Sequence, residues 1–207
     1  MILKLSSLYP SLKQIQRIVQ ILQNDGIISY PTDTLYAIGC SAESPKAVSL
    51  LNKIKHTKEN KPKEYSIIVS SLQEISKYAI VNNRNFLILK NNLPGPYTFI
   101  LPAKKSLPSA LFRKNKKTIG IRIPNNYIAI EIVKELNCPL ITTSVTDEKG
   151  SNISDPYEIE KKFRQYLDII IDDGELHNIQ GTVVDLTQEE PVIVREGEGI
   201  DRLQLFY

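Results

Sequence analysis

The feature that most constrains the fold is an alternation of short apolar runs with amphipathic segments, which continues from one end of the chain to the other. Apolar side chains at helical spacing predict helices, and short β-branched runs bounded by turn residues predict strands. The predicted helices are residues 12–22, 45–54, 71–78, 83–90, 127–136 and one that begins at 156. The predicted strands are residues 27–30, 65–69, 97–101, 118–123, 140–143, 167–171, 182–186 and 191–194.

This order of elements predicts an α/β fold. Helices between strands favour a sheet covered on both faces, whereas the consecutive strands near the C-terminal end have no helix between them and favour antiparallel pairing. We therefore expect a three-layer domain with a twisted mixed β-sheet flanked by helices. Neither a break in composition nor a repeat divides the 207 residues, so we expect a single domain over residues 1–207.

Charge alone does not point to nucleic acid, because 26 Lys and Arg residues stand against 23 Asp and Glu residues. Basic residues nevertheless cluster in two segments, 53–63 and 113–117. Charge clusters of this kind are usually solvated loops. Residues 55–63 of the first cluster are rich in lysine and have no apolar periodicity, so we also expect them to act as a lid.

The cysteine count and the N-terminus predict a cytoplasmic protein without a membrane association. Cys40 and Cys138 are too few for a disulfide framework, so we expect buried free thiols in a reducing compartment. The first residues lack the basic and apolar regions of a signal peptide, and no apolar run approaches the ~18 residues of a membrane span.

Several hydroxyl-bearing residues lie at the end of the first predicted strand and directly after it, in the segment Tyr30-Pro31-Thr32-Asp33-Thr34-Leu35-Tyr36. Pro31 cannot continue strand pairing, so the residues after it lie at the rim of the sheet. If the segment is extended, Thr32, Thr34 and Tyr36 share one face, and Asp33 and Leu35 point the other way. The alternative is a turn in which the Thr and Asp side chains bind their own backbone.

Other predicted strands also end in polar residues, namely Arg122, Thr143, Ser144 and Arg195. Ligands of α/β folds collect at the carboxyl ends of strands, so we expect these side chains to converge on one site. Their chemistry suits phosphate or carboxylate, because guanidinium groups and hydroxyls are donors to anionic oxygens.

Several other kinds of site are excluded. The chain has no Walker-type loop and no Gly-x-Gly-x-x-Gly sequence, and His56 and His177 are its only histidines. We therefore expect no metal site, no tightly bound cofactor and no histidine-activated nucleophile.

Five segments resemble, in order, the motifs of the YrdC-like family, whose best-known members make threonylcarbamoyladenylate. They are residues 31–40, 94–101, 119–124, 139–144 and 192–197. The resemblance implies a YrdC-like domain in which L-threonine takes up bicarbonate and the resulting carbamate attacks the α-phosphorus of ATP. Pyrophosphate leaves, and the product serves the threonylcarbamoyladenosine modification of tRNA. Mg²⁺ would enter with ATP, and no protein nucleophile is needed.

The resemblance also implies two groups of site residues. The residues expected to bind threonine are Thr32, Thr34, Tyr36, Arg122 and Thr143. The residues expected to bind the nucleotide are Lys55, Ser144, Thr146 and Arg195.

Two positions depart from the synthase pattern. Thr57 stands where the synthases carry the arginine of Lys-x-Arg, and Thr146 stands where they carry the asparagine of Ser-x-Asn. A threonine cannot form the bidentate contact of an arginine with phosphate. With the segments 90–101 and 117–120, these departures are most similar to the YciO branch of the family.

Two alternatives to a threonylcarbamoyladenylate synthase stay open. The first is a YciO-type protein that binds double-stranded RNA, tRNA or the ribosome, and its candidate contacts are Lys53, Lys58, Lys61 and Lys63 together with Lys55. The second is an enzyme that uses the same pocket for a different carbamoyl or acyl adenylate.

Overall fold

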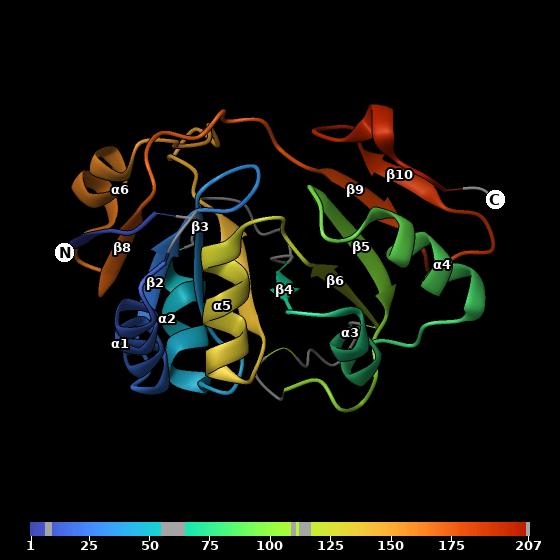
Figure 1. The fold of residues 1–207 in the computed structure, drawn as a ribbon, viewed down its shortest axis with the longest axis horizontal. Coiled ribbons are helices and arrows are strands. Elements are labelled where there is room, and N and C mark those ends of the chain that lie inside the picture. The colour runs from blue at the N-terminus through green and yellow to red at the C-terminus, as the bar shows by residue number, and fades with distance from the viewer. Residues whose placement is uncertain (7–9, 55–64, 109–110, 112–116, 206–207) are drawn as a thin grey trace.

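The computed structural model describes residues 1–6, 10–54, 65–108, 111 and 117–205, and Figure 1 shows the fold. The strands are β1 (Ile2–Lys4), β2 (Ile27–Tyr30), β3 (Ala37–Ser41), β4 (Ser66–Ile68), β5 (Tyr97–Pro102), β6 (Thr118–Arg122), β7 (Leu140–Ser144), β8 (Ile169–Asp172), β9 (Thr182–Asp185) and β10 (Val192–Arg195). The helices are α1 (Leu12–Gln23), α2 (Pro45–Ile54), α3 (Leu72–Tyr78), α4 (Asn83–Asn92), α5 (Tyr127–Leu136) and α6 (Pro156–Phe163), and a 3₁₀ turn, η2, covers Ile200–Arg202.

The described strands form one sheet in the order β1-β8-β2-β3-β7-β4-β6-β5-β9-β10. The pairs β1–β8, β2–β8, β4–β6 and β5–β9 are parallel. The pairs β2–β3, β3–β7, β4–β7, β5–β6 and β9–β10 are antiparallel. The prediction of an α/β fold with a mixed sheet is confirmed.

Successive residues of the central strands supply two separate hydrophobic cores, one on each face of the sheet. Ile27 and Ile67 belong to the core that includes residues of α2, α3, α4 and α6. Their neighbours Ile28 and Ile68 belong to the core that includes residues of α1 and α5. Because side chains alternate along a strand, these two cores lie on opposite faces and the domain has three layers.

Helices α1 and α5 cover only part of their face, and Figure 1 shows both of them towards the end of the sheet that carries β8, β2 and β3. The core beneath them takes residues from β8, β2 and β3 and reaches Leu140 of β7 and Ile68 of β4. On the same face, Thr142 and Ser66 lie two residues away from Leu140 and Ile68 and line a cavity. The uncovered part of this face therefore carries a cavity.

Every predicted helix and strand has a counterpart in the structure, but strands β1 and β3 were not predicted. Strand β3 is Ala-Ile-Gly-Cys-Ser, a sequence with little β-branching, and it follows directly after the hydroxyl-rich segment. Its strand state is set by pairing on both sides, with β2 and β7. Tertiary pairing thus overrides weak local propensity here.

The predicted free thiols are confirmed, because Cys40 and Cys138 are both buried and unpaired. Burial raises the pKa of the Cys40 thiol to about 12, so the thiolate is disfavoured there. Among the helices that the structure describes, none has the length and apolar character that crossing a membrane would require.

Candidate functional site

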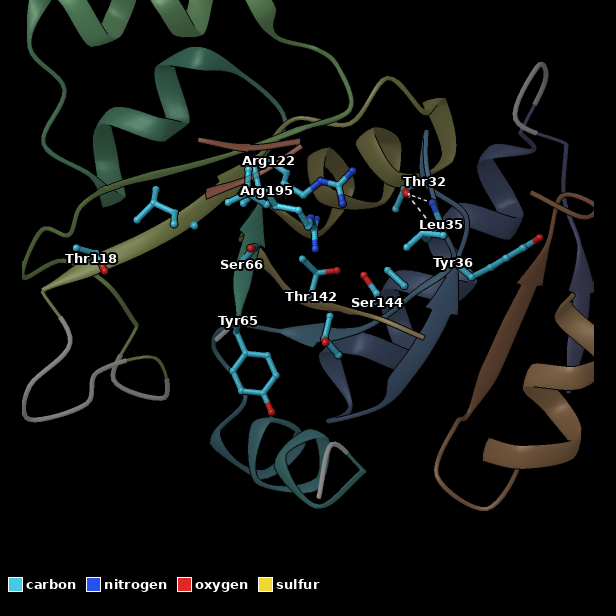
Figure 2. Close-up of a pocket in the computed structure, with 16 residues that line it drawn as sticks. Thr32, Leu35, Tyr36, Tyr65, Ser66, Thr118, Arg122, Thr142, Ser144 and Arg195 are labelled. Carbon is cyan, nitrogen blue, oxygen red and sulfur yellow. Dashed lines mark hydrogen bonds between the residues drawn. The ribbon is translucent and has the colours of Figure 1, made fainter. Parts of the chain in front are cut away.

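A cavity of about 220 Å³ opens on the uncovered face of the sheet (Figure 2). It brings together six of the residues predicted from sequence to form the site, namely Thr32, Tyr36, Arg122, Thr143, Ser144 and Arg195. These residues come from the segment after β2 and from strands β6, β7 and β10. The ends of these strands therefore meet at one cavity, as the sequence predicted.

The two arginines of the cavity come from strands that are distant in sequence. Arg122 is the last residue of β6 and Arg195 is the last residue of β10, and the order β6-β5-β9-β10 brings them to one side of the sheet. Their guanidinium groups lie near each other in Figure 2. Burial lowers the pKa of Arg195, and the positive charge of Arg122 lowers it further. The site thus concentrates positive charge.

Arg122 is held by a carboxylate that the sequence analysis did not assign to the site. Its Nη2 atom donates to Asp33 Oδ1 at 3.0 Å and to Thr34 Oγ1 at 3.2 Å, and the second carboxylate oxygen of Asp33 accepts from the Asn125 amide at 2.9 Å. The side chains of Arg122 and Asp33 are only 13% and 9% exposed. The Arg122 Nε atom is buried without a hydrogen-bond partner among the described residues.

Arg195 is held differently, by the backbone. Its Nε and Nη2 atoms both donate to the carbonyl oxygen of Gly181, at 3.1 and 2.8 Å. Within the described residues, no carboxylate forms an ion pair with it. Arg195 is exposed at the cavity, so its guanidinium, which lacks a carboxylate partner among the described residues, is accessible to an anion.

The segment between β2 and β3 is a turn, so the extended alternative was wrong. The Thr32 hydroxyl donates to the Leu35 carbonyl at 2.6 Å and accepts from the amides of Thr34 and Leu35, each at 3.2 Å. Thr34 does not line the cavity and instead contacts Arg122 and Thr32. Leu35 and Asp33, predicted to point away, lie at the cavity wall and against Arg122.

The Tyr36 hydroxyl does not join the threonine hydroxyls, contrary to the predicted shared face. It donates to the Gly174 carbonyl at 2.7 Å and accepts from the Asp173 amide at 3.1 Å. Figure 2 shows its side chain directed away from Thr32 and the arginines. The physical reason is the turn, since only an extended segment would place every second side chain on one face. Tyr36 ties the segment after β8 to the start of β3.

Two residues at the end of β7 and just after it were predicted to bind the nucleotide, and only one of them lines the cavity. Ser144 lines the cavity, and so does Thr143, which was predicted to bind threonine. Thr146 is not among the lining residues, and its backbone forms an isolated bridge with Asn152. The role of Thr146 in nucleotide binding stays a prediction.

Most of the predicted lysine contacts lie outside the residues that the structure describes. They are Lys55, Lys58, Lys61 and Lys63, and Thr57 and the predicted lid also belong to this segment. Lys53 is described, is exposed in the last turn of α2 and does not line the cavity. RNA binding through these lysines stays a prediction.

A set of hydroxyl-bearing residues that was not predicted from the sequence lies within strands or next to them. They are Tyr65, Ser66, Thr98, Thr118 and Thr142, and all of them line the cavity. The pattern Thr118-Ile-Gly120-Ile-Arg122 carries the signal, because Thr118, Gly120 and Arg122 alternate with buried apolar residues. Polar residues at every second position of a strand indicate a face that no helix covers.

Arginines and hydroxyl-bearing residues supply the hydrogen-bond donors that line the cavity. In the described part of the chain, no group of three or more His, Cys, Asp or Glu residues is arranged to hold a metal ion. The donors at the cavity therefore suit phosphate and carboxylate oxygens.

Residues 20–197 match the Sua5_yciO_yrdC family, which is described as "Telomere recombination". The YciO protein of Escherichia coli K12, described as uncharacterized, is 38% identical over 192 residues, which make up 92% of each chain. A crystal structure of E. coli YciO resembles this chain with a TM-score of 0.89 at 36% identity, over 96% of each chain.

Two further proteins resemble this chain more distantly. The threonylcarbamoyl-AMP synthase of Psychromonas ingrahamii is 26% identical over 177 residues, which cover 83% of this chain and 87% of that protein. A crystal structure of Pyrococcus abyssi Sua5 complexed with L-threonine has a TM-score of 0.86 at 22% identity, over 98% of this chain and 60% of that one. The likeness to Sua5 is one of fold.

Proposed function

This chain belongs to the Sua5/YciO/YrdC family, and we propose that it is a nucleotidyltransferase similar to the L-threonylcarbamoyladenylate synthases. The observation that supports the proposal most is the cavity on the open sheet face, where Arg122 and Arg195 meet a wall of hydroxyls. The Sua5 relative complexed with L-threonine supports the amino acid as one substrate.

In the proposed reaction, the amine of L-threonine takes up bicarbonate and releases water, which gives a carbamate. A carbamate oxygen then attacks the α-phosphorus of ATP, the bond to the β-phosphate breaks and pyrophosphate leaves. The product, threonylcarbamoyl-AMP, serves the modification of tRNA. Both steps use substrate atoms alone, so the protein contributes by holding the reactants and stabilising negative charge.

The threonine substrate fits the side of the cavity that Arg122 occupies. The Arg122 guanidinium, which Asp33 and Thr34 orient, faces the threonine carboxylate with donors that these partners do not use. The turn of Thr32 closes this side, and the backbone near Thr143 borders the carbamate.

The nucleotide fits the side that Arg195 and Ser144 occupy. Arg195 supplies a charge without a carboxylate partner among the described residues, and Ser144 supplies a neutral donor. Lys55, which the resemblance also assigns to nucleotide binding, lies outside the described residues. Mg²⁺ enters with ATP as part of the substrate.

The proposal is tested by pyrophosphate release from Mg·ATP, measured with purified protein in the presence and absence of L-threonine and bicarbonate. We expect release to require both, and we expect mass spectrometry to detect threonylcarbamoyl-AMP. Release that is indifferent to both additions would contradict the proposal. Release that requires bicarbonate but a different amine or acid would instead favour the alternative of another carbamoyl or acyl adenylate.

A further inference from the structure

The Tyr30 side chain extends across strand β3 to the floor of the cavity. Tyr30 is paired with Ala37, and Gly39, two residues further along β3, is paired with Thr142 of β7. A Cβ atom at Gly39 would lie 3.0 Å from Tyr30 Cε1 and 3.3 Å from the Tyr30 hydroxyl oxygen. Gly39 therefore leaves the space through which the Tyr30 ring reaches Thr142.

The hydroxyl groups of Tyr30 and Thr142 meet at the boundary between the core and the cavity. Tyr30 belongs to the core beneath α1 and α5 and is fully buried, whereas Thr142 lines the cavity. The Tyr30 hydroxyl donates to Thr142 Oγ1 at 2.7 Å. Burial raises the pKa of Tyr30, so the phenol stays neutral and keeps the proton that it donates.

The contact with Tyr30 determines which hydrogen-bonding groups of the Thr142 hydroxyl remain available to a ligand. A threonine hydroxyl has one proton to donate and two lone pairs to accept. Tyr30 occupies one lone pair, and in the described structure the Thr142 hydroxyl has no protein acceptor for its own proton. The hydroxyl therefore has an unused donor at the cavity floor.

The space next to Thr142 is open for ligand atoms. Ser66 of β4 is paired with Thr142, and Gly120 of β6 is paired with Ser66, so the three residues form a row across the floor. Gly120 has no side chain, and a Cβ atom there would lie 2.7 Å from the Ser66 hydroxyl oxygen. The Ser66 hydroxyl therefore lies over Gly120, and the open space is the cavity that Ser66, Gly120 and Thr142 all line.

We propose that Thr142 is a ligand-binding residue that donates a hydrogen bond to an anionic oxygen of the substrate, and that Tyr30 is the positioning residue that orients it. The inference rests on the proposed function only in the identity of the anion, a phosphate oxygen of the nucleotide. A neutral donor here complements the two arginines and favours an anionic oxygen at the floor over a donor group.

A bond that serves only the core would affect stability but not binding, and the chain offers a matched control. The Tyr97 hydroxyl donates to the Gly199 carbonyl at 2.9 Å, and Tyr97 is also buried. Tyr97 does not line the cavity. Tyr97→Phe therefore removes a comparable buried bond without changing the cavity floor.

The test is calorimetric binding of Mg·ATP and of inorganic pyrophosphate to wild type and to Thr142→Val, Thr142→Ser, Tyr30→Phe, Tyr97→Phe and the double variant Tyr30→Phe/Thr142→Val. We expect Thr142→Val to weaken binding of at least one probe by about tenfold or more, which is the range for a hydrogen bond to a charged group. We expect Tyr30→Phe to weaken it by roughly threefold, because Thr142 keeps its donor but loses its orientation. Thr142→Ser and Tyr97→Phe should stay within about twofold of wild type.

The double variant separates positioning from independent binding. If Tyr30 acts through Thr142, the double variant binds no more weakly than Thr142→Val alone. Affinities of Thr142→Val that equal those of wild type for both probes overturn the proposal, and so does a Tyr30→Phe effect that Tyr97→Phe reproduces. Wild-type protein that binds neither probe overturns it as well. Probe binding that depends on Thr142, without threonine-dependent turnover, supports this inference while the proposed function fails.

Discussion

The two arginines of the cavity are held in different ways, although both end a strand on the same face of the sheet. Arg122 forms an ion pair with Asp33 at 3.0 Å, whereas Arg195 donates to the backbone carbonyl of Gly181. The charge of Arg122 is therefore largely balanced before a ligand arrives, and that of Arg195 is not. This difference indicates that Arg122 holds its guanidinium in a fixed orientation for a ligand, whereas Arg195 attracts an anion by its unbalanced charge.

The largest expected effect comes from removing the partner of Arg122. Asp33→Ala leaves a nearly buried guanidinium without its carboxylate, so we expect the free energy of unfolding to fall by about 3 kcal/mol. Urea denaturation measures this loss. In the double variant Asp33→Ala/Arg122→Met, which removes both charges, much of the stability should return. A double variant as unstable as Asp33→Ala would show that the ion pair is not the cause.

Arg195→Gln should have the next largest effect, and on binding instead of folding. Because Arg195 has no carboxylate partner in the described structure, its loss should weaken ATP binding by about a hundredfold, while the free energy of unfolding changes by less than ~1 kcal/mol. Calorimetry and thermal unfolding measure the two quantities. Arg202→Gln is the control, because Arg202 is exposed and pairs with Glu198 outside the cavity. Equal ATP affinities for these two variants would remove the distinction between the arginines.

Tyr36→Phe should have a smaller effect, confined to stability. It removes the bonds of the Tyr36 hydroxyl to residues 173 and 174, so we expect a loss of about 1 kcal/mol in the free energy of unfolding. Binding of L-threonine, followed by thermal shift, should stay within about threefold. A loss of threonine binding without a loss of stability would return Tyr36 to the ligand-binding role expected from the resemblance.

The smallest effect is expected for Lys53→Ala. Lys53 is exposed and does not line the cavity, so ATP affinity and the free energy of unfolding should change by less than about twofold and ~0.5 kcal/mol. Salt-titrated binding of a short RNA duplex to the same variant examines the RNA alternative. A clear loss of duplex binding that grows at low salt would favour that alternative.

The sequence predicted those parts of the site that depend on local pattern. Arg122 and Arg195 stood out because each ends an apolar strand, and side-chain alternation brings them to one face. The Asp33–Arg122 pair could not be predicted in this way, because 89 positions separate the partners and the turn reverses the expected direction of Asp33. Strand β3 was missed for a related reason, since its pairing partners define it more than its composition does.

The partial cover that α1 and α5 give to one face has a consequence for strand β7. Leu140 lies in the dry core, Thr142 on the cavity floor and Ser144 at the cavity wall, while Ile141 belongs to the core on the opposite face. Within five residues, the requirement on the side chain therefore changes once: apolar volume matters at Leu140 and Ile141, and hydrogen-bonding chemistry matters at Thr142 and Ser144. A complete substitution scan of this strand would separate variants that reduce the amount of folded protein from variants that fold normally and lose only ligand.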